Sequence, residues 1–188
     1  MTELTFTQAQ ADMRYGYFDG AAGILVSGLV WLVAGLVAVL ASEKIAVLAL
    51  LFGGAAIHPL SVLVAKLFGR PGAHSKGNPL GRLAIEGTLW MLAGIAIAYG
   101  MHVLRLEWFF PAMLLIVGGR YLTFQSLYGL RIYWVCGAIL CLAGIVLALA
   151  RAPVSMGAFA GAAIELIFAA LVFSLARRRG AAYPLAQH

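Results

Sequence analysis

The sequence predicts an all-α membrane protein with six membrane-spanning helices, and two observations lead to this fold class. The chain has 188 residues, of which 63% are hydrophobic and only 11% are charged. Average soluble domains carry about 25% charged residues, so this chain cannot cover a compact soluble domain with polar surface. Its apolar residues also form six long runs, each close to the ~20 residues that a helix needs to cross a bilayer. We therefore expect a polytopic transmembrane domain at 20–176, between an N-terminal segment at 1–19 and a C-terminal tail at 177–188.

The six apolar runs are joined mostly by very short polar segments. The runs lie at 21–42, 45–67, 83–104, 108–130, 132–150 and 154–176. Short connections place consecutive helices side by side and antiparallel. The segment at 68–82 is longer, and its glycines and prolines predict a loop. Before the first run, the polar and aromatic residues at 12–20 are interpreted as an interfacial anchor, with a cap over the helical bundle as the alternative.

A short motif occurs three times, each time on the first helix of a pair. The copies are GLVWLVAG from Gly28, GTLWMLAG from Gly87 and GAILCLAG from Gly137. Small residues seven apart share one helix face and let a neighbouring helix approach closely. We interpret the copies as three tandem helical hairpins that are inserted the same way round. The alternative is chance similarity among helices rich in glycine and alanine.

The distribution of basic residues predicts how the chain sits in the membrane. Nine lysines and arginines flank the apolar runs on one side, against three on the other. The positive-inside rule then places both termini in the cytoplasm, here of a bacterial inner (plasma) membrane. The same residues are expected to contact anionic lipid headgroups. They form no patch with aromatic residues, so the net charge of +6 does not indicate nucleic-acid binding.

Glu165 is the strongest candidate for a functional residue. It follows Gly157 and Gly161 at intervals of four, so the three residues share one helix face. A glycine face packs against another helix, which predicts that Glu165 points into the bundle. Charged residues near the middle of a membrane helix cost about 2.5–3.5 kcal/mol on insertion scales, so such a residue needs a partner or a purpose.

Three further ionisable residues lie inside the apolar runs. Arg120 is central in the fourth run, and its expected partners are Glu165 and Glu86. His58 precedes Pro59, and a proline kink beside a histidine could open a small polar cavity. Glu86 lies closer to the end of its run. These four ionisable residues form the predicted substrate- or proton-binding site.

A purely structural role for the same residues stays open. Intramembrane Arg and Glu residues often form ion pairs that hold helices together without further activity. In that interpretation His58 is a hydrogen-bonding core residue, and Glu86 reaches headgroups or pairs with Arg82. The number of charges favours a functional role. There are two carboxylates, Glu86 and Glu165, and Arg120 can neutralise only one of them, so the other must be protonated or interact with His58. A protonatable buried carboxyl group is the minimum equipment for proton coupling.

Motifs for other kinds of chemistry are missing from the sequence. There is no glycine-rich phosphate loop, no metal-ligand spacing of His or Cys residues, and no Ser-His-Asp set. The chain is therefore not expected to be an enzyme or to bind a metal or cofactor.

Two stretches resemble a family of small bacterial inner-membrane proteins of unknown function. They are the stretch from Asp12-Met-Arg-Tyr to Gly28-Leu-Val-Trp, and Gly53-Gly-Ala-Ala-Ile-His-Pro-Leu. The resemblance implies a membrane location but no activity, so it assigns no functional residue. The paired helices are also similar in outline to bacterial acid-stress membrane proteins. Two functions remain: a small transporter or channel, with proton linkage as its candidate mechanism, and a non-transporting structural or stress-related membrane protein. The glycine faces serve contacts within one chain or within a homo-oligomer equally well.

Overall fold

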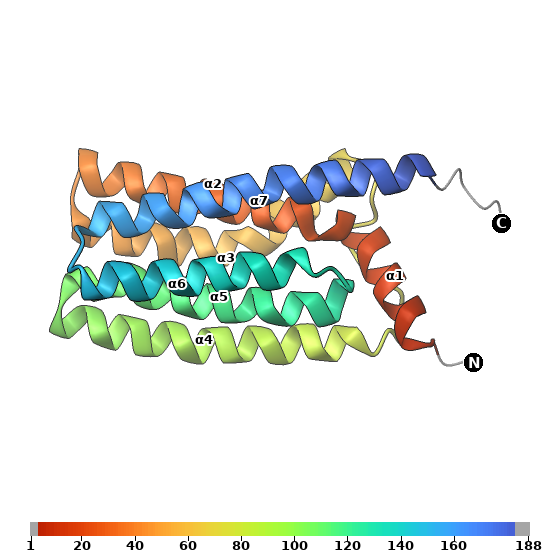
Figure 1. The fold of residues 1–188 in the computed structure, drawn as a ribbon, viewed down its shortest axis with the longest axis horizontal. Helices are drawn as coiled ribbons and strands as arrows, with labels where there is room; N and C mark the ends of the chain where they lie inside the picture. The colour runs from red at the N-terminus through yellow and green to blue at the C-terminus, as the bar shows by residue number, and fades with distance from the viewer. Residues whose placement is uncertain (1–3, 183–188) are drawn as a thin grey trace.

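The structure is a computed structural model that describes residues 4–182, and within this range all regular secondary structure is helical. Six long helices lie side by side along the longest axis, and a short helix lies across one end (Figure 1). In chain order the elements are α1 (Phe6–Tyr17), η1 (Phe18–Gly20), α2 (Ala21–Leu40), α3 (Glu43–Leu67), α4 (Leu80–Leu104), η2 (Leu106–Trp108), α5 (Phe109–Tyr128), α6 (Ile132–Leu149) and α7 (Val154–Ala182).

Five helices in the described range are long and apolar enough to cross a membrane. They are α2, α3, α4, α6 and α7. Helix α5 is as long as α2, with 20 residues, but it carries the polar stretch from Arg120 to Ser126. The all-α membrane fold is thus supported, whereas a sixth span through α5 stays a prediction.

The last helix extends beyond its predicted end. The apolar run ends near Ala176, but α7 continues through three arginines to Ala182. Alanine and arginine are strong helix formers, so the helix does not stop where the apolar residues do. The rest of the predicted tail, 183–188, and residues 1–3 lie outside the described range.

Helix packing does not simply follow chain order. The most extensive contacts join α2 with α7 and α5 with α6. Helix α3 packs mainly on α2 and α4 mainly on α5, so these two helices leave most of their surface exposed. The first and last long helices of the chain are therefore neighbours at the centre of the fold.

The repeated glycines lie at close helix contacts, as their spacing predicts. A Cβ atom at Gly28 would lie 2.9 Å from Leu166 of α7, and one at Gly94 would lie 3.0 Å from Ile116 of α5. A Cβ atom at Gly144 would meet the backbone of α5 at 2.7 Å. The three copies thus contact partners that are not equivalent, and the arrangement as three equivalent hairpins is not confirmed.

Trp31 fills the contact between α2 and α7. Its side chain is 1% exposed and packs edge-on against Phe110, with ring centroids 5.9 Å apart. A Cβ atom at Gly161 of α7 would lie 2.5 Å from the indole ring. The bulky residue on α2 and the missing side chain on α7 are therefore complementary.

Helix α1 begins with a capping box and ends at a sharp turn. Thr5 and Gln8 exchange hydrogen bonds at its start. Phe18 and Asp19 then adopt left-handed backbone angles, with φ of 53° and 56°, and Gly20 follows with φ of 86°. Three such residues in a row redirect the chain, so α1 cannot continue straight into α2.

Helix α1 caps the end of the bundle, as the alternative interpretation predicts, and its role as an interfacial anchor stays a prediction. The amide of Gln10 donates to the Ser126 carbonyl oxygen at 2.9 Å, and the Arg14 guanidinium donates to the Tyr128 carbonyl oxygen at 2.7 Å. Both carbonyls belong to the last turn of α5, whose final carbonyl groups lack partners within the helix. Side chains of α1 therefore complete the hydrogen bonding of α5.

Asp12 fastens α1 to the loop between α3 and α4. Its carboxylate accepts hydrogen bonds from the Ser75 backbone N–H at 2.9 Å, the Ser75 hydroxyl at 2.6 Å and the Asn78 amide at 2.7 Å. The Asn78 amide also donates to the Ala9 carbonyl oxygen at 3.0 Å. Asn78 is only 5% exposed, so the loop predicted at 68–82 is anchored at this point.

The complementarity of Gly161 and Trp31 predicts the effect of adding one methyl group. Gly161→Ala should destabilise the fold by ~1–3 kcal/mol, because overpacking a tight contact forces neighbours to shift. Gly54→Ala on α3 is the matched control, since a Cβ atom there meets nothing within 4 Å. Thermal unfolding in detergent measures both. Equal midpoints for the two variants would contradict the proposed contact.

The Asp12 hydrogen bonds predict that α1 can be loosened separately. Asp12→Ala should speed amide hydrogen exchange in α1 at least tenfold, because buried Asn78 loses an acceptor, at a cost of ~1–3 kcal/mol. Exchange in α7 should not change. Ser174→Ala is the control, since this hydroxyl bonds only to Ala170 within its own helix. Unchanged exchange in α1 would show that the cap is held by other contacts.

Candidate functional site

Glu165 lies at the centre of the bundle and confirms the inward orientation that its glycine face predicts. It is 0% exposed, and its neighbours are Ser27 of α2, Tyr121 of α5 and Cys136 of α6. Although the Ser27 and Tyr121 side chains face the carboxyl group, neither of its oxygens has a partner at good hydrogen-bond geometry. Four helices thus enclose an acidic group without neutralising it.

Arg120 does not pair with Glu165, so this expected interaction is wrong. Its guanidinium donates to the Thr88 hydroxyl of α4 at 2.9 Å and lies 5.3 Å from the ring centroid of Phe124. Within residues 4–182 it forms no ion pair with Glu86 either. The reason is helix geometry: successive residues point about 100° apart, and Tyr121 occupies the direction toward Glu165.

His58 and Glu86 lie on outer faces of the bundle, with Glu86 closer to the α1 end. By residue count, His58 is about 14 Å from the end of α3, and Glu86 is about 9 Å from the start of α4. Both residues are exposed, and α3 and α4 are the helices with the least buried surface. The chain therefore does not bring the four predicted site residues together.

A series of polar groups that the sequence interpretation missed connects Glu165 with the α1 end. Tyr121, beside Glu165, stacks on Tyr133 of α6 with ring centroids 6.1 Å apart. The Tyr133 hydroxyl donates to the Asp19 backbone oxygen at 2.5 Å. The Asp19 carboxylate, in a residue that is only 6% exposed, lies 3.2 Å from the Arg179 guanidinium. Two stacked tyrosines thus lie between Glu165 and the backbone of Asp19, and these two residues carry the only buried carboxyl groups in the described range.

The sequence contained one signal for this series. Asp19-Gly20 is a turn dipeptide, and a carboxylate just before a membrane helix suggests a tie to a nearby cation. Nothing local predicts that Tyr133 reaches Asp19, since 114 residues separate them. Only the packing of α6 beside α7 and α5 brings the two together.

Two apolar grooves lie on the outside of the bundle. One, of about 460 Å³, lies between α4 and α5 and reaches Ala148 and Leu149 of α6. The other, of about 370 Å³, lies between α2 and α3. Neither groove is lined by Glu165 or His58, so the polar cavity expected beside the Pro59 kink is not part of them.

The fold and site together define a multi-pass helical membrane protein with a buried acidic residue in its interior. The chain belongs to the family of unknown function DUF7010, whose model matches residues 6–175. It matches no curated protein and no solved structure. The family match confirms the resemblance to a family of unknown function, and the matched residues include Glu165 and its neighbours on α2, α5 and α6.

The unpartnered carboxyl group predicts an unusual response to substitution. Glu165→Met should raise the stability of the fold by ~1–3 kcal/mol, because it replaces an unsatisfied buried polar group with an apolar one of similar size. Glu86→Met, at an exposed carboxylate, is the control and should change little. Thermal unfolding in detergent measures both. A strong loss of stability in Glu165→Met would show that the carboxyl group holds the helices together.

Proposed function

We propose that this protein is a small proton-linked membrane transporter in which Glu165 gains and loses the transported proton. One observation carries the proposal: Glu165 is completely buried, and within the described residues only the hydroxyl groups of Ser27 and Tyr121 face its carboxyl group, with no cation in ion-pair contact. A carboxylate in such surroundings is expensive, so the interior tolerates the protonated, neutral form better. A group that is stable when neutral and costly when charged is suited to carry protons.

The surroundings of Glu165 support this role. By residue count the carboxyl group lies about 18 Å along α7 from Arg177. Tyr121, Tyr133 and Asp19 lie between it and the α1 end. Their polar groups mark the side from which a proton would reach Glu165, although the Tyr133 hydroxyl bonds to the Asp19 backbone oxygen and not to its carboxylate. Movement of α2 against α7 would open the other side.

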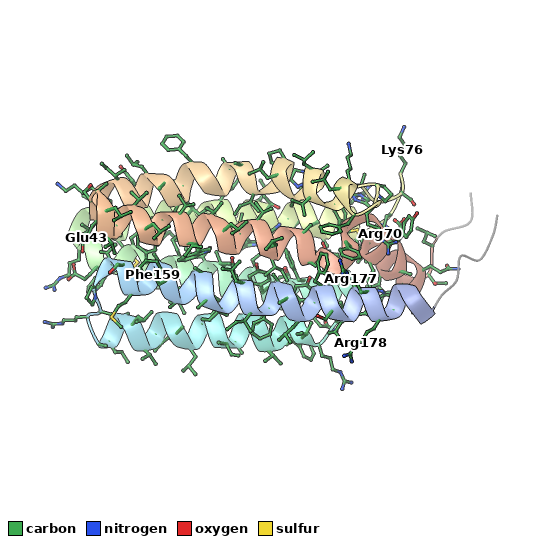
Figure 2. All side chains as sticks on the ribbon, turned by 90° about the horizontal axis from the view of Figure 1, so that it is seen from above. Glu43, Arg70, Lys76, Phe159, Arg177 and Arg178 are labelled. Carbon is green, nitrogen blue, oxygen red and sulfur yellow. The ribbon has the colours of Figure 1, made fainter. Side chains whose placement is uncertain are left out.

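The setting of this transporter follows from the charge distribution. Arg70, Arg177 and Arg178 lie at the α1 end of the bundle, and Glu43 lies at the opposite end (Figure 2). The excess of basic residues at the α1 end supports an orientation in a bacterial inner membrane with this end on the cytoplasmic side. In this arrangement α5 crosses the membrane as well, because its polar residues face α4 and the bundle interior rather than lipid.

A structural membrane protein is the second candidate, and the close packing around Glu165 favours it. Gly28, Gly161 and Trp31 bring α2 and α7 into tight contact beside the carboxyl group. A rigid contact of this kind suits a protein that stabilises the bilayer or a partner complex. In that case Glu165 is a packing residue that transfers no protons.

Proton flux into liposomes distinguishes the two functions. Purified protein is reconstituted with a pH-sensitive dye inside, and a potassium gradient with an ionophore sets the membrane potential. Wild type should acidify the interior, and Glu165→Gln should reduce the rate at least tenfold, because an amide cannot exchange the proton. Glu43→Gln removes an exposed carboxylate at the far end and should keep the wild-type rate. Folding of each variant is checked by its thermal unfolding midpoint.

Two outcomes would overturn the transport proposal. One is the same flux in wild type and in well-folded Glu165→Gln protein. The other is no flux of protons in folded wild type under any imposed gradient, which would favour the structural candidate.

A further inference from the structure

Two arginines at the α1 end are held against a cluster of aromatic rings. The cluster consists of Phe18, Phe68 and Phe173, whose ring centroids lie 4.7–5.8 Å apart. The Arg70 guanidinium lies 5.3 Å from the Phe18 ring centroid, and the Arg177 guanidinium lies 4.8 Å from that of Phe173. Rings on η1, after α3 and on α7 thus bring the two cations to one place.

The positive charge at this place exceeds the negative charge available. The Asp19 carboxylate is paired with Arg179 at 3.2 Å and also attracts Arg14 and Arg70 over a longer range, and the Asp12 carboxylate is occupied by Ser75 and Asn78. In the described part of the chain, neither Arg70 nor Arg177 forms an ion pair. Arginine is a preferred ligand for phosphate, because its planar guanidinium donates two parallel hydrogen bonds. Stacking on rings limits its movement and orients those donors.

An apolar groove begins about one helical turn along α3 from Phe68 of the aromatic cluster. It is lined by Leu60, Leu63 and Val64 of α3 on one side and by α2 on the other. Val64 precedes Phe68 by one helical turn, about 6 Å along the axis. The groove holds about 370 Å³ and then continues along α2 to Val33, away from the α1 end. A cationic pair and an apolar groove are therefore adjacent, with the groove pointing toward the bilayer interior.

We propose that this region binds an anionic phospholipid, with its phosphate on Arg70 and Arg177 and one acyl chain in the groove between α2 and α3. The charge of the two arginines matches a phosphate group, and the groove matches a hydrocarbon chain. Both features lie at the membrane boundary, where anionic lipids are available. The proposal is independent of proton transport, because Glu165 lines no part of the groove.

Lipid titration of the purified full-length chain tests this site. Native mass spectrometry in neutral detergent measures binding of phosphatidylglycerol and of phosphatidylcholine with identical acyl chains. We expect at least tenfold tighter binding of phosphatidylglycerol. The double variant Arg70→Gln/Arg177→Gln should lose this preference.

Arg178→Gln is the matched control for charge. Arg178 neighbours Arg177, is exposed and contacts no ring (Figure 2). Its removal should change phosphatidylglycerol affinity less than twofold. The single variant Arg177→Gln, which removes the same charge one residue away, should weaken binding clearly more. If the two single variants weakened binding equally, the attraction would be general surface charge and the proposed site would be overturned.

A groove variant and two competitors separate the lipid from free phosphate. Leu63→Trp should fill the groove and weaken phosphatidylglycerol binding at least fivefold, because the acyl chain loses its place. Inorganic phosphate and glycerol phosphate at equal concentration should not displace the lipid. If either competed as well as the lipid itself, or if Leu63→Trp had no effect in folded protein, the site would take phosphate alone and the lipid proposal would fail. Thermal unfolding midpoints confirm that each variant is folded.

Discussion

The close contact between α2 and α7 is the constraint on which the rest of the structure depends. Gly161 leaves room for the Trp31 ring, and Gly28 leaves room for Leu166. A membrane offers no hydrophobic driving force between helices, so close van der Waals packing must supply the association. Around this pair, α3 packs against α2, and α6 and α5 pack against α7.

The same contact explains how a carboxyl group remains inside the bundle. Glu165 occurs four residues after Gly161, so the packing that seats Trp31 also turns Glu165 toward α2. Burying the Glu165 carboxyl group costs free energy, and the close packing that small residues allow between α2 and α7 offsets part of this cost. Stability and the acidic site therefore share one surface, and neither can change without the other.

The sequence predicted features that depend on one helix and missed those that depend on several. Runs of apolar residues predicted α2 to α6 within a few residues and the start of α7, and glycine spacing predicted that Glu165 faces inward. The partner of Arg120 was wrong, because it depends on how α5 is rotated against α4, and no local pattern records that rotation. His58 and Glu86 were assigned to the site because both lie inside apolar runs, and a position along a run can be estimated by counting residues. The direction of each side chain depends instead on how its own helix packs, and both side chains point away from the bundle interior.

Pairing the first long helix with the last has a consequence for the order of assembly in the cell. The ribosome makes α2 early, but α7 leaves it only after more than a hundred further residues. At ~5–20 residues per second, α2 waits on the order of ten seconds for its partner. During that interval the Trp31 side chain, which later packs against Gly161, must contact lipid or the insertion machinery. Nascent chains truncated before α7 hence lack the contact between α2 and α7.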